Sequence, residues 1–567
     1  MDARTRHLAA ALTGFGLGLA ALGPGLAPGF LLSYDMVFVP DPAFTPMTFG
    51  LTGSVPRQVP SDAVATALGT VVPAWVAQRL LLLAVFVMAC TAAASLVPSG
   101  RLVPRLVAGV CYAWNPFVAE RLLLGQWALL LGYAALPWVV AAASRADEHG
   151  GGRRLVRALI PAAIGGYGAL TVSGLAALTV AVTRGRRAGV AKVPAALAVL
   201  SLPWLVPGLL RPGGVPGEGV AVEAFAARAD TPFGTLGSLL LLGGVWNGET
   251  VPVGYGTPVT AALWGAVVLS ALFAYGVYGR RSERMAPWWR GAAIAAAVGF
   301  AAASLGAVVP SLLEGAIDLW SGFAVLRDGQ QFVAPLAVVV AVGLALAADK
   351  VLDVGHSAVA YGALLAPLVL LPSLAWGAGG QLRSVDYPGD WARAREIIDA
   401  DPVAGDVLVL PWAYYRGYPW NHGRRVLDPL PRYLHRRVIV NDALRVGGTT
   451  VPSEDPKARR LDGAIRSGAP LTATLREAGV RYVAVDVRDP AADPGPRRLP
   501  GAGTVLRGDD LLLYRITRSD VVPDNGPPVA AVTVAWIVMS GAIFWSIVMR
   551  ATNVSALLGS IPRRRDP

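Results

Sequence analysis

Charged side chains are scarce in this sequence, and that scarcity excludes a water-soluble enzyme of ordinary composition. They make up 15% of the 567 residues, whereas apolar residues make up 54%, and the mean hydropathy is +0.52. The chain also contains 65 Gly and 44 Pro, but the apolar runs between them are long. This pattern excludes disorder and favours short, broken or tightly packed membrane helices.

Two further absences narrow the chemistry. The two cysteines, Cys90 and Cys111, fall inside apolar runs, so we expect them to pack as small apolar side chains and not to form a structural disulfide. The HExxH, CxxC, Walker and GxSxG patterns are missing, and His422 and His435 lack the clustered spacing of a zinc site. No metal ligands or cofactor are therefore predicted, and assistance by a divalent metal stays open.

A net charge of +12 is typical of proteins that bind nucleic acids, so the positions of the charges along the chain must be considered. Residues 380–526 hold 22 Lys/Arg and 19 Asp/Glu, so this part of the chain is nearly neutral. The other 420 residues carry 27 basic and 18 acidic groups, and the basic ones lie in short clusters between apolar runs. Cytoplasmic loops of membrane proteins carry such clusters. The charge therefore indicates membrane topology, and no nucleic acid is required.

Apolar runs long enough to cross a bilayer occur along the whole chain. The stretch 156–183 lies between two Arg clusters, so we expect two short helices there, with a turn near Gly165 and Gly166 or near Ser173 and Gly174. Counted in this way, the sequence predicts about twelve spans: 9–33, 72–97, 102–117, 127–144, two within 156–183, 193–210, 258–278, 291–309, 332–349, 357–377 and 528–549.

The basic clusters also predict the orientation of these spans. Placing Arg4 and Arg6 in the cytoplasm brings the later Arg clusters to the same side, including Arg563 to Arg565 near the end of the sequence. We therefore expect a multi-pass plasma membrane protein with both termini cytoplasmic and an N-terminal run that is retained and not cleaved as a signal peptide. The segments expected outside are 34–71, 115–126, 211–257, 310–331 and 380–526.

The block 380–526 alternates helix-like and strand-like pieces, which favours a small α/β domain. We expect helices over 390–399 and 471–479 and strands over 406–412, 480–487 and 511–516. The predicted organisation is an α-helical transmembrane bundle with outer loops over 1–379, an extracytoplasmic α/β domain over 380–526, and a final transmembrane helix with a basic cytoplasmic tail over 527–567.

The first outer loop carries the acidic residues best placed for catalysis. Asp35 follows the first span, and Asp41 lies six residues further on in a Pro-rich loop. A carboxylate at the edge of a water-poor cavity can act as a general base toward a sugar hydroxyl, because partial burial raises its pKa. The alternative is that both residues are solvated loop acids.

Two other outer segments combine Arg with polar neighbours. Arg121 stands beside Glu120 between closely joined spans, where its forked donors can hold a lipid phosphate or can pair with Glu120 to orient the loop. Arg327 can balance a leaving phosphate, while neighbouring amides can contact hydroxyl groups. The alternative is an Arg–Asp pair at a helix start. The polar residues in this group are Gln126, Asp328, Gln330 and Gln331.

Aromatic residues complete the candidate set. Trp246 lies in the 211–257 segment, and Trp420 and His422 lie in the stretch PWAYYRGYPWNHGR, 411–424. Aromatic rings beside polar groups are typical of carbohydrate platforms, but they are equally typical of a surface that contacts lipid headgroups.

Together these features resemble the GT-C superfamily of polytopic glycosyltransferases, in particular actinobacterial arabinofuranosyltransferase-like and YfhO-like membrane proteins. The resemblance rests on the Asp35 loop, the NPFVAERLLLGQWALLLGYAALPW stretch (115–138), the LRDGQQF stretch (326–332) and the late α/β block. It covers most of the chain with loose motifs. The arabinofuranosyltransferases are much longer and carry extra carbohydrate-binding modules, so the sugar and the acceptor are not carried over.

The resemblance implies a membrane glycosyltransferase that moves a sugar from a polyprenyl-phosphate donor to a cell-envelope glycan, lipid or protein acceptor on the outer face. Asp35 would be the base, and Arg121 and Arg327 would bind the donor phosphate. The rival is a transporter, flippase or assembly partner for lipid-linked glycans, although the paired repeats typical of transporters are not found. Expected sugar or acceptor contacts are Asp41, Glu120, Gln126, Asp328, Gln330, Gln331, Trp246, Trp420 and His422.

Overall fold

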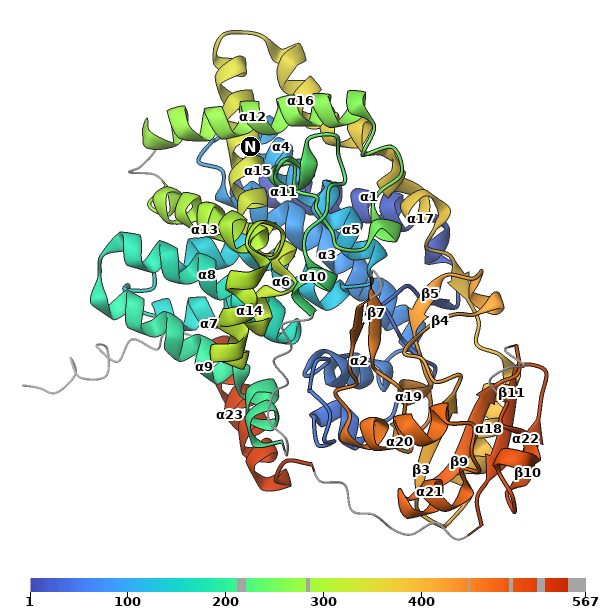
Figure 1. Cartoon of the computed structure of the whole chain (residues 1–567). Helices are drawn as coiled ribbons and strands as arrows, with labels where there is room; N and C mark the ends of the chain where they lie inside the picture. Colours follow the sequence, from blue (N-terminus) through green and yellow to red (C-terminus); the bar gives the residue numbers. More distant parts are fainter. Residues whose placement is uncertain are drawn as a thin grey trace, which may run out of the picture.

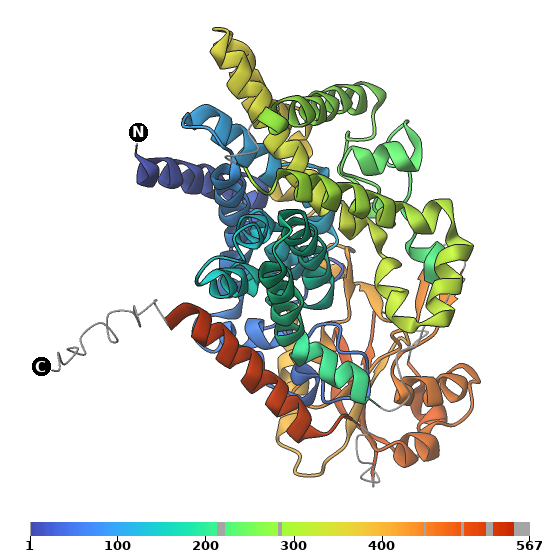
Figure 2. The ribbon, with the colours of Figure 1, turned by 90° about the vertical axis from the view of Figure 1, so that its left-hand side faces the viewer.

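The computed structural model is a helical bundle that carries a lobe of strands and short helices at one end (Figures 1 and 2). The structure describes residues 2–211, 221–281, 286–446, 449–488, 493–517 and 526–548. The predicted basic tail over 549–567 lies outside the described residues.

Eight helical segments among the described residues are long and apolar enough to cross a membrane. The first and seventh of these are completed by the short 3-10 helices η1 (Gly23–Leu26) and η5 (Gly329–Val333). The helices are α1 (Ala3–Leu22), α3 (Ala74–Leu96), α8 (Gly166–Arg184), α9 (Arg187–Leu210), α12 (Pro258–Arg281), α13 (Trp289–Val308), α15 (Ala334–Asp353) and α23 (Val529–Val548). The chain is therefore a multi-pass helical membrane protein.

The remaining predicted spans form shorter or bent helices, so the expected count of twelve is not confirmed. The predicted span 102–117 ends early as α4 (Leu102–Ala113), because the Asn115 side chain accepts a hydrogen bond from the Val118 amide and starts α5 (Pro116–Leu123). The other two shorter helices are α6 (Trp127–Ala143) and α7 (Gly151–Ile164). The break expected near Gly165 and Gly166 is confirmed, because α7 ends and α8 begins there.

The predicted span 357–377 is bent by 59° between α16 (Ser357–Leu370) and the segment Pro372–Gly380. That segment contains α17 (Ala375–Gly380), and its residues Trp376 to Gly379 all have positive φ values. Left-handed backbone costs non-glycine residues about 1–2 kcal/mol each, so Gly377 and Gly379 make this turn less costly.

Small residues let the helices of the bundle approach closely. A Cβ added to Gly343 of α15 would lie 2.0 Å from the Ala271 carbonyl oxygen of α12, and one added to Gly299 of α13 would lie 2.2 Å from the Phe332 oxygen. Close backbone contact of this kind stabilises helix pairs in membranes. The high glycine content of the sequence therefore corresponds to tight packing around the buried central helix α15.

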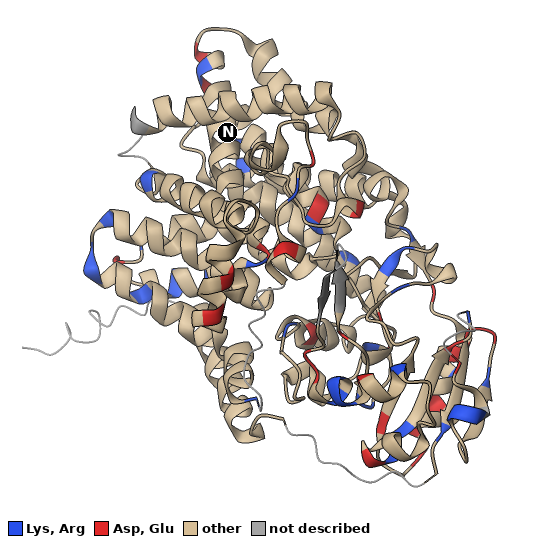
Figure 3. Ribbon diagram, in the orientation of Figure 1, with Lys and Arg blue, Asp and Glu red and all other residues tan. Residues whose placement is uncertain are grey.

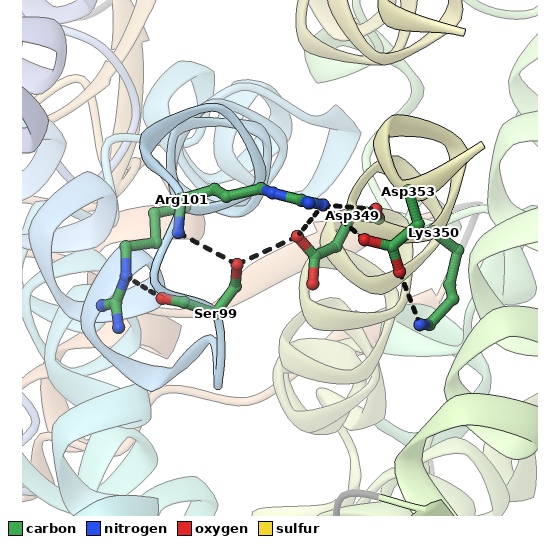
Figure 4. A network of polar contacts seen from close by, with 6 residues as sticks. Ser99, Arg101, Asp349, Lys350 and Asp353 are labelled. Carbon is green, nitrogen blue, oxygen red and sulfur yellow. Dashed lines mark hydrogen bonds and ion pairs between the residues drawn. The ribbon is translucent and has the colours of Figure 1, made fainter. Parts of the chain in front are cut away.

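The end of α15 farthest from the lobe is held by a charged network (Figure 4). The Nη1 atom of Arg101 lies 2.7 Å from Oδ1 of Asp353 and 3.4 Å from Oδ1 of Asp349. The Ser99 hydroxyl donates to Asp349 at 3.0 Å, and Lys350 pairs with Asp353 at 2.7 Å. These contacts connect the α3–α4 loop to α15 at the end predicted to be cytoplasmic.

The lobe contains a mixed five-stranded sheet in which the order is β10, β11, β9, β3, β6. Its strands are β3 (Asp406–Leu410), β6 (Val438–Ile439), β9 (Val480–Asp486), β10 (Gly503–Arg507) and β11 (Leu511–Arg515). Strand β3 runs parallel to β6 and β9, and β11 runs antiparallel to β9 and β10. Helices α18 (Gly389–Asp399), α20 (Pro456–Arg466) and α21 (Thr472–Glu477) accompany it.

The secondary structure predicted for this block is confirmed where it was specified. The three predicted strands correspond to β3, β9 and β11, and the two predicted helices correspond to α18 and α21. Figure 3 shows acidic and basic residues interspersed over the lobe and few charges along the bundle helices.

Backbone pairing joins the lobe to the bundle. Strand β1 (Phe30–Leu31), which follows the first span, runs antiparallel to β2 (Ser384–Val385) at the start of the lobe. Further on, Tyr34 forms a parallel bridge with Val426 of β5 (Arg425–Leu427), which makes a hairpin with β4 (Tyr415–Gly417). The first loop is thus held in place by segments from the last third of the sequence.

Candidate functional site

A cavity of about 330 Å³ lies between the bundle and the lobe. Each of the segments predicted to lie outside the membrane contributes to its wall, as does the break between α7 and α8 at Gly165. The polar and aromatic side chains among the wall residues include Asp35, Arg57, Asp62, Gln126, Tyr167, Trp246, Arg327, Asp328, Gln331, Tyr414, Tyr415, Arg432, Asp442 and Glu454.

Asp35 is fixed in this wall by the backbone on both sides. The Tyr34 amide donates to the Arg425 carbonyl at 2.8 Å, and the Asp35 amide donates to the Leu124 carbonyl at 3.0 Å. Tyr34 has a φ of +44°, which is rare for a bulky residue and marks a conformation held by its surroundings. The loop and α5 approach closely at Gly125, where an added Cβ would lie 2.1 Å from the Ser33 oxygen.

The carboxylate of Asp35 accepts a hydrogen bond of 2.6 Å from the Tyr415 hydroxyl. Burial raises the pKa of Asp35 above its ordinary value, and the hydrogen bonds from Tyr415 and Gln126 oppose that rise. A carboxylate with a raised pKa is a better proton acceptor while it is ionised. The surroundings of Asp35 therefore match the role of general base.

Three arginines bring positive charge to the same wall. Arg57 pairs with Glu454 through both Nε, at 3.0 Å, and Nη2. Arg432 pairs with Asp62 at 2.9 Å, and the Arg327 guanidinium lies 6.0 Å from the ring centre of Phe225. Guanidinium groups beside a cavity can bind a phosphate with two parallel hydrogen bonds.

The charges of Arg57 and Arg327 act on one carboxyl group. Burial alone would raise the pKa of Glu454, but Arg57, followed by Arg327, holds it below the ordinary value. Glu454 therefore stays ionised, and its negative charge balances part of the positive charge of Arg57 and Arg327.

Sequence reasoning missed Arg57 and Arg432. Arg57 is the only Lys or Arg between Arg6 and Arg79, and it lies in the same loop as Asp35, so its isolation was a usable signal. Arg432 is one of several arginines in a charged block, and nothing in the local sequence distinguishes it from Arg436 or Arg437.

Arg121 lies behind the wall and is not among the residues that line the cavity. Its buried guanidinium donates to Gln126 at 2.9 Å and to Gln330 at 3.5 Å, and it lies 3.7 Å from Oδ1 of Asp328. Two of these partners, Gln126 and Asp328, themselves face the cavity. Arg121 is thus placed to orient wall residues of the cavity.

The other predicted residues divide between the cavity and its surroundings. Gln126, Asp328, Gln331 and Trp246 line the cavity, whereas Gln330 is buried behind it and donates to the Phe225 carbonyl at 2.8 Å.

Glu120 is also buried behind the cavity, next to Asp230. Burial, followed by the charge of Asp230, raises the pKa of Glu120 well above its ordinary value.

Three predicted residues lie away from the cavity. The Asp41 side chain is 83% exposed and pairs with Arg395 of the lobe at 3.2 Å. Trp420 packs against Tyr387, Trp391 and Tyr418 inside the lobe. His422 is exposed and lines a different groove. The structure therefore does not bring these three residues to the side chain of Asp35.

The cavity combines carboxyl groups with guanidinium groups and amides. Burial raises the pKa of Asp62, Asp428 and Asp442 as it raises that of Asp35. Within the described part of the chain, no group of three or more His, Cys, Asp or Glu side chains is arranged to hold a metal ion. The side chains present can accept a proton, balance a phosphate charge and donate hydrogen bonds to hydroxyl groups.

Comparisons with known proteins identify the fold. No family model and no curated protein matches the chain. Among solved structures, it is similar to the arabinofuranosyltransferase AftD from Mycobacteria, with 18% identity and a TM-score of 0.56 over 92% of this chain and 40% of that one. A structure of an AftD mutant matches with 19% identity and the same TM-score over 92% of this chain and 42% of that one.

The chain therefore spans about two fifths of the length of the AftD structures that it matches. The structural likeness extends over nearly all of the present sequence, including the bundle and the lobe. In agreement with the resemblance predicted from the sequence, this chain has the fold of the matched part of the arabinofuranosyltransferase AftD.

Proposed function

We propose that this protein is a membrane glycosyltransferase that moves a sugar from a polyprenyl-phosphate donor to a cell-envelope glycan, lipid or protein acceptor on the outer face. The observation that supports it best is the cavity in which Asp35, with its raised pKa, faces the same space as Arg57, Arg327 and Arg432. Sharing a fold does not determine function, so the proposal rests on the residues of this cavity.

In the proposed reaction, Asp35 accepts the proton of an acceptor hydroxyl as its oxygen attacks the anomeric carbon of the donor sugar. The bond between that carbon and the phosphate oxygen breaks, and its electron pair stays with the phosphate. Arg327 balances the charge that develops on the leaving phosphate, which is the largest electrostatic requirement of such a step. Arg57 and Arg432, from the first loop and the lobe, add two further guanidinium groups to the wall, where they are paired with Glu454 and Asp62.

Arg121 takes a positioning role in this scheme. Its hydrogen bond to Gln126 and its ion pair with Asp328 hold two wall residues in place, and Gln126 in turn contacts Asp35. Loss of Arg121 should therefore disturb the base indirectly, through the wall.

The test follows transfer of labelled sugars from a panel of polyprenyl-phosphate donors by the purified protein. Asp35→Asn keeps the size of the side chain and removes its ability to accept a proton, so transfer should fall by about 100-fold or more. Asp41→Asn is the matched control, because Asp41 lies in the same loop, its side chain is 83% exposed and it does not line the cavity. It should transfer sugar at the wild-type rate.

Each outcome is informative. Unchanged transfer in Asp35→Asn would exclude Asp35 as the base. If the wild-type protein transfers no sugar from any donor but moves labelled polyprenyl-phosphate sugars across vesicle membranes, the transporter hypothesis replaces the enzyme.

A further inference from the structure

A second groove, of about 600 Å³, lies where α17, the first loop and the β4–β5 hairpin meet. Figure 1 shows the hairpin directly beside the chain that leaves α17. Tyr34 lines this groove, and Tyr415 lines the Asp35 cavity. The centroids of their two rings are 6.1 Å apart. The two spaces therefore lie on either side of this pair of aromatic rings and have different walls.

Arg424 is the fixed element of the groove. Its Nε donates to the Ser33 hydroxyl at 2.6 Å, its Nη1 to Gln381 Oε1 at 2.9 Å, and its Nη2 to the Leu123 carbonyl at 3.1 Å. Each of these acceptors is a neutral oxygen. Burial lowers the pKa of Arg424, and the nearby Tyr34 and Glu249 only partly oppose the effect.

Two more guanidinium groups face the same space. Arg383 is exposed and donates from Nε to the Gly380 carbonyl at 2.9 Å. The side chain of Arg425 is 63% exposed and lies 3.7 Å from Glu249, which also accepts a hydrogen bond from Tyr34. With His422 neutral, the ionisable side chains that line the groove carry a net charge of +2. The groove is thus built for an anion.

The position of the groove indicates which kind of anion it can bind. It adjoins the end of the bent helix pair α16–α17, whose Val369 and Trp376 side chains are 71% and 68% exposed. Exposed apolar side chains on a membrane helix face lipid, and Trp concentrates at the headgroup level. The groove therefore opens at the level where phosphate groups of membrane lipids are found.

We propose that this groove binds a phosphate group, with Arg424 as the fixed donor and Arg383 and Arg425 as exposed donors that close on the ligand. Guanidinium groups suit phosphate because their planar forks donate two parallel hydrogen bonds. The phosphate comes either from an anionic lipid or from a free phosphate. The proposal does not depend on sugar transfer in the Asp35 cavity.

Binding to the full-length, detergent-solubilised protein tests the proposal. The probes are inorganic phosphate and two short-chain lipids below their micelle-forming concentration, phosphatidylglycerol and phosphatidylcholine. The variant R383Q/R425Q removes the exposed donors and leaves the packed Arg424 in place. The matched control is R460Q/R507Q, which removes two exposed lobe charges that do not line the groove.

We expect R383Q/R425Q to bind phosphatidylglycerol about 30-fold more weakly than the wild type, as removal of two interfacial basic residues predicts. The control should bind as the wild type does. A loss seen equally with inorganic phosphate would identify free phosphate as the source, whereas a loss confined to phosphatidylglycerol would identify the lipid. The proposal is overturned if R383Q/R425Q binds all three probes like the wild type, or if the control loses as much affinity.

Discussion

The hydrogen bond between Tyr415 and Asp35 should control the acidic side of the pH–rate profile of sugar transfer. It joins residues that are 380 positions apart at a distance of 2.6 Å. Tyr415→Phe removes the hydroxyl but keeps the ring that contacts Tyr34. The substitution therefore separates the electrostatic contribution of Tyr415 from its contribution to packing.

The size of the effect follows from the strength of a hydrogen bond to a charged group, about 1.5–3 kcal/mol. This bond stabilises the ionised form of Asp35 and lowers its pKa against the effect of burial. Since one pKa unit corresponds to about 1.4 kcal/mol, Tyr415→Phe should raise the pKa of Asp35 by about one to two units.

The sign is fixed by the proposed role of Asp35 as a base. Transfer requires the ionised carboxylate, so the rate falls as the pH drops through the pKa of Asp35. In Tyr415→Phe this fall should begin about one to two pH units higher. Below the wild-type midpoint the variant should be about 10- to 100-fold slower. At high pH, where Asp35 is ionised in both proteins, the variant should be at least as fast as the wild type.

The assay is the pH dependence of labelled-sugar transfer at saturating acceptor. Tyr414→Phe provides the control, because Tyr414 is the neighbouring residue in the same cavity wall and its hydroxyl hydrogen-bonds Gln58 and not Asp35. An acidic limb that stays at the wild-type pH in Tyr415→Phe would refute the assignment of Asp35 as the base held by Tyr415. Equal shifts in both variants would attribute the effect to the wall in general.

Three further predictions concern stability, and each is tested by the thermal unfolding of detergent-solubilised protein. Gly125→Ala should destabilise the protein and abolish transfer, because the added Cβ would overlap the Ser33 backbone oxygen. Gly234 has a similar φ and open space around it, so Gly234→Ala should lower the free energy of unfolding by only about 1–2 kcal/mol. Equal destabilisation in the two variants would contradict this prediction. Gly377→Ala should likewise destabilise more than Gly379→Ala, because only its Cβ would come within 2.4 Å of a backbone oxygen. Arg481 and the Tyr482 hydroxyl hold the pKa of Asp401 well below its ordinary value against the effect of burial. The ionised Asp401 therefore stabilises the folded protein above the unfolded-state pKa of about 3.9, and this stabilisation is lost as the pH falls. The destabilisation in Asp401→Asn, about 2 kcal/mol at pH 7, should therefore shrink below pH 3, and a constant difference would contradict it.

The sequence predicted the fold best where a local pattern determines the structure. The strand-like runs of the lobe correspond to β3, β9 and β11, because alternating or buried apolar residues set their conformation directly. The predicted span 102–117 is not confirmed as one helix, because hydropathy extends through Phe117, whereas α4 ends four residues earlier, before the Asn115 cap. A capping side chain overrides hydropathy, which a sliding window does not register.

The candidate site shows the same division. Asp35 was predictable from its place after the first span, but its partner Tyr415 was not, because the contact depends on how β5 pairs with Tyr34. Arg121 was expected to face the donor phosphate, and the fold instead turns its side chain inward toward Gln126 and Gln330. The direction of a side chain on a short helix between two spans depends on tertiary packing, which a single sequence does not encode locally.

The pairing of the first loop with the β4–β5 hairpin also has a consequence for biosynthesis. Asp35 emerges early in translation, whereas the hydroxyl that orients it belongs to a residue made 380 positions later. Until the lobe has been synthesised and has paired with Tyr34, the cavity lacks the wall that the lobe supplies. A partly synthesised chain can therefore occupy the membrane without an assembled cavity, so the candidate site forms only after the lobe has been completed.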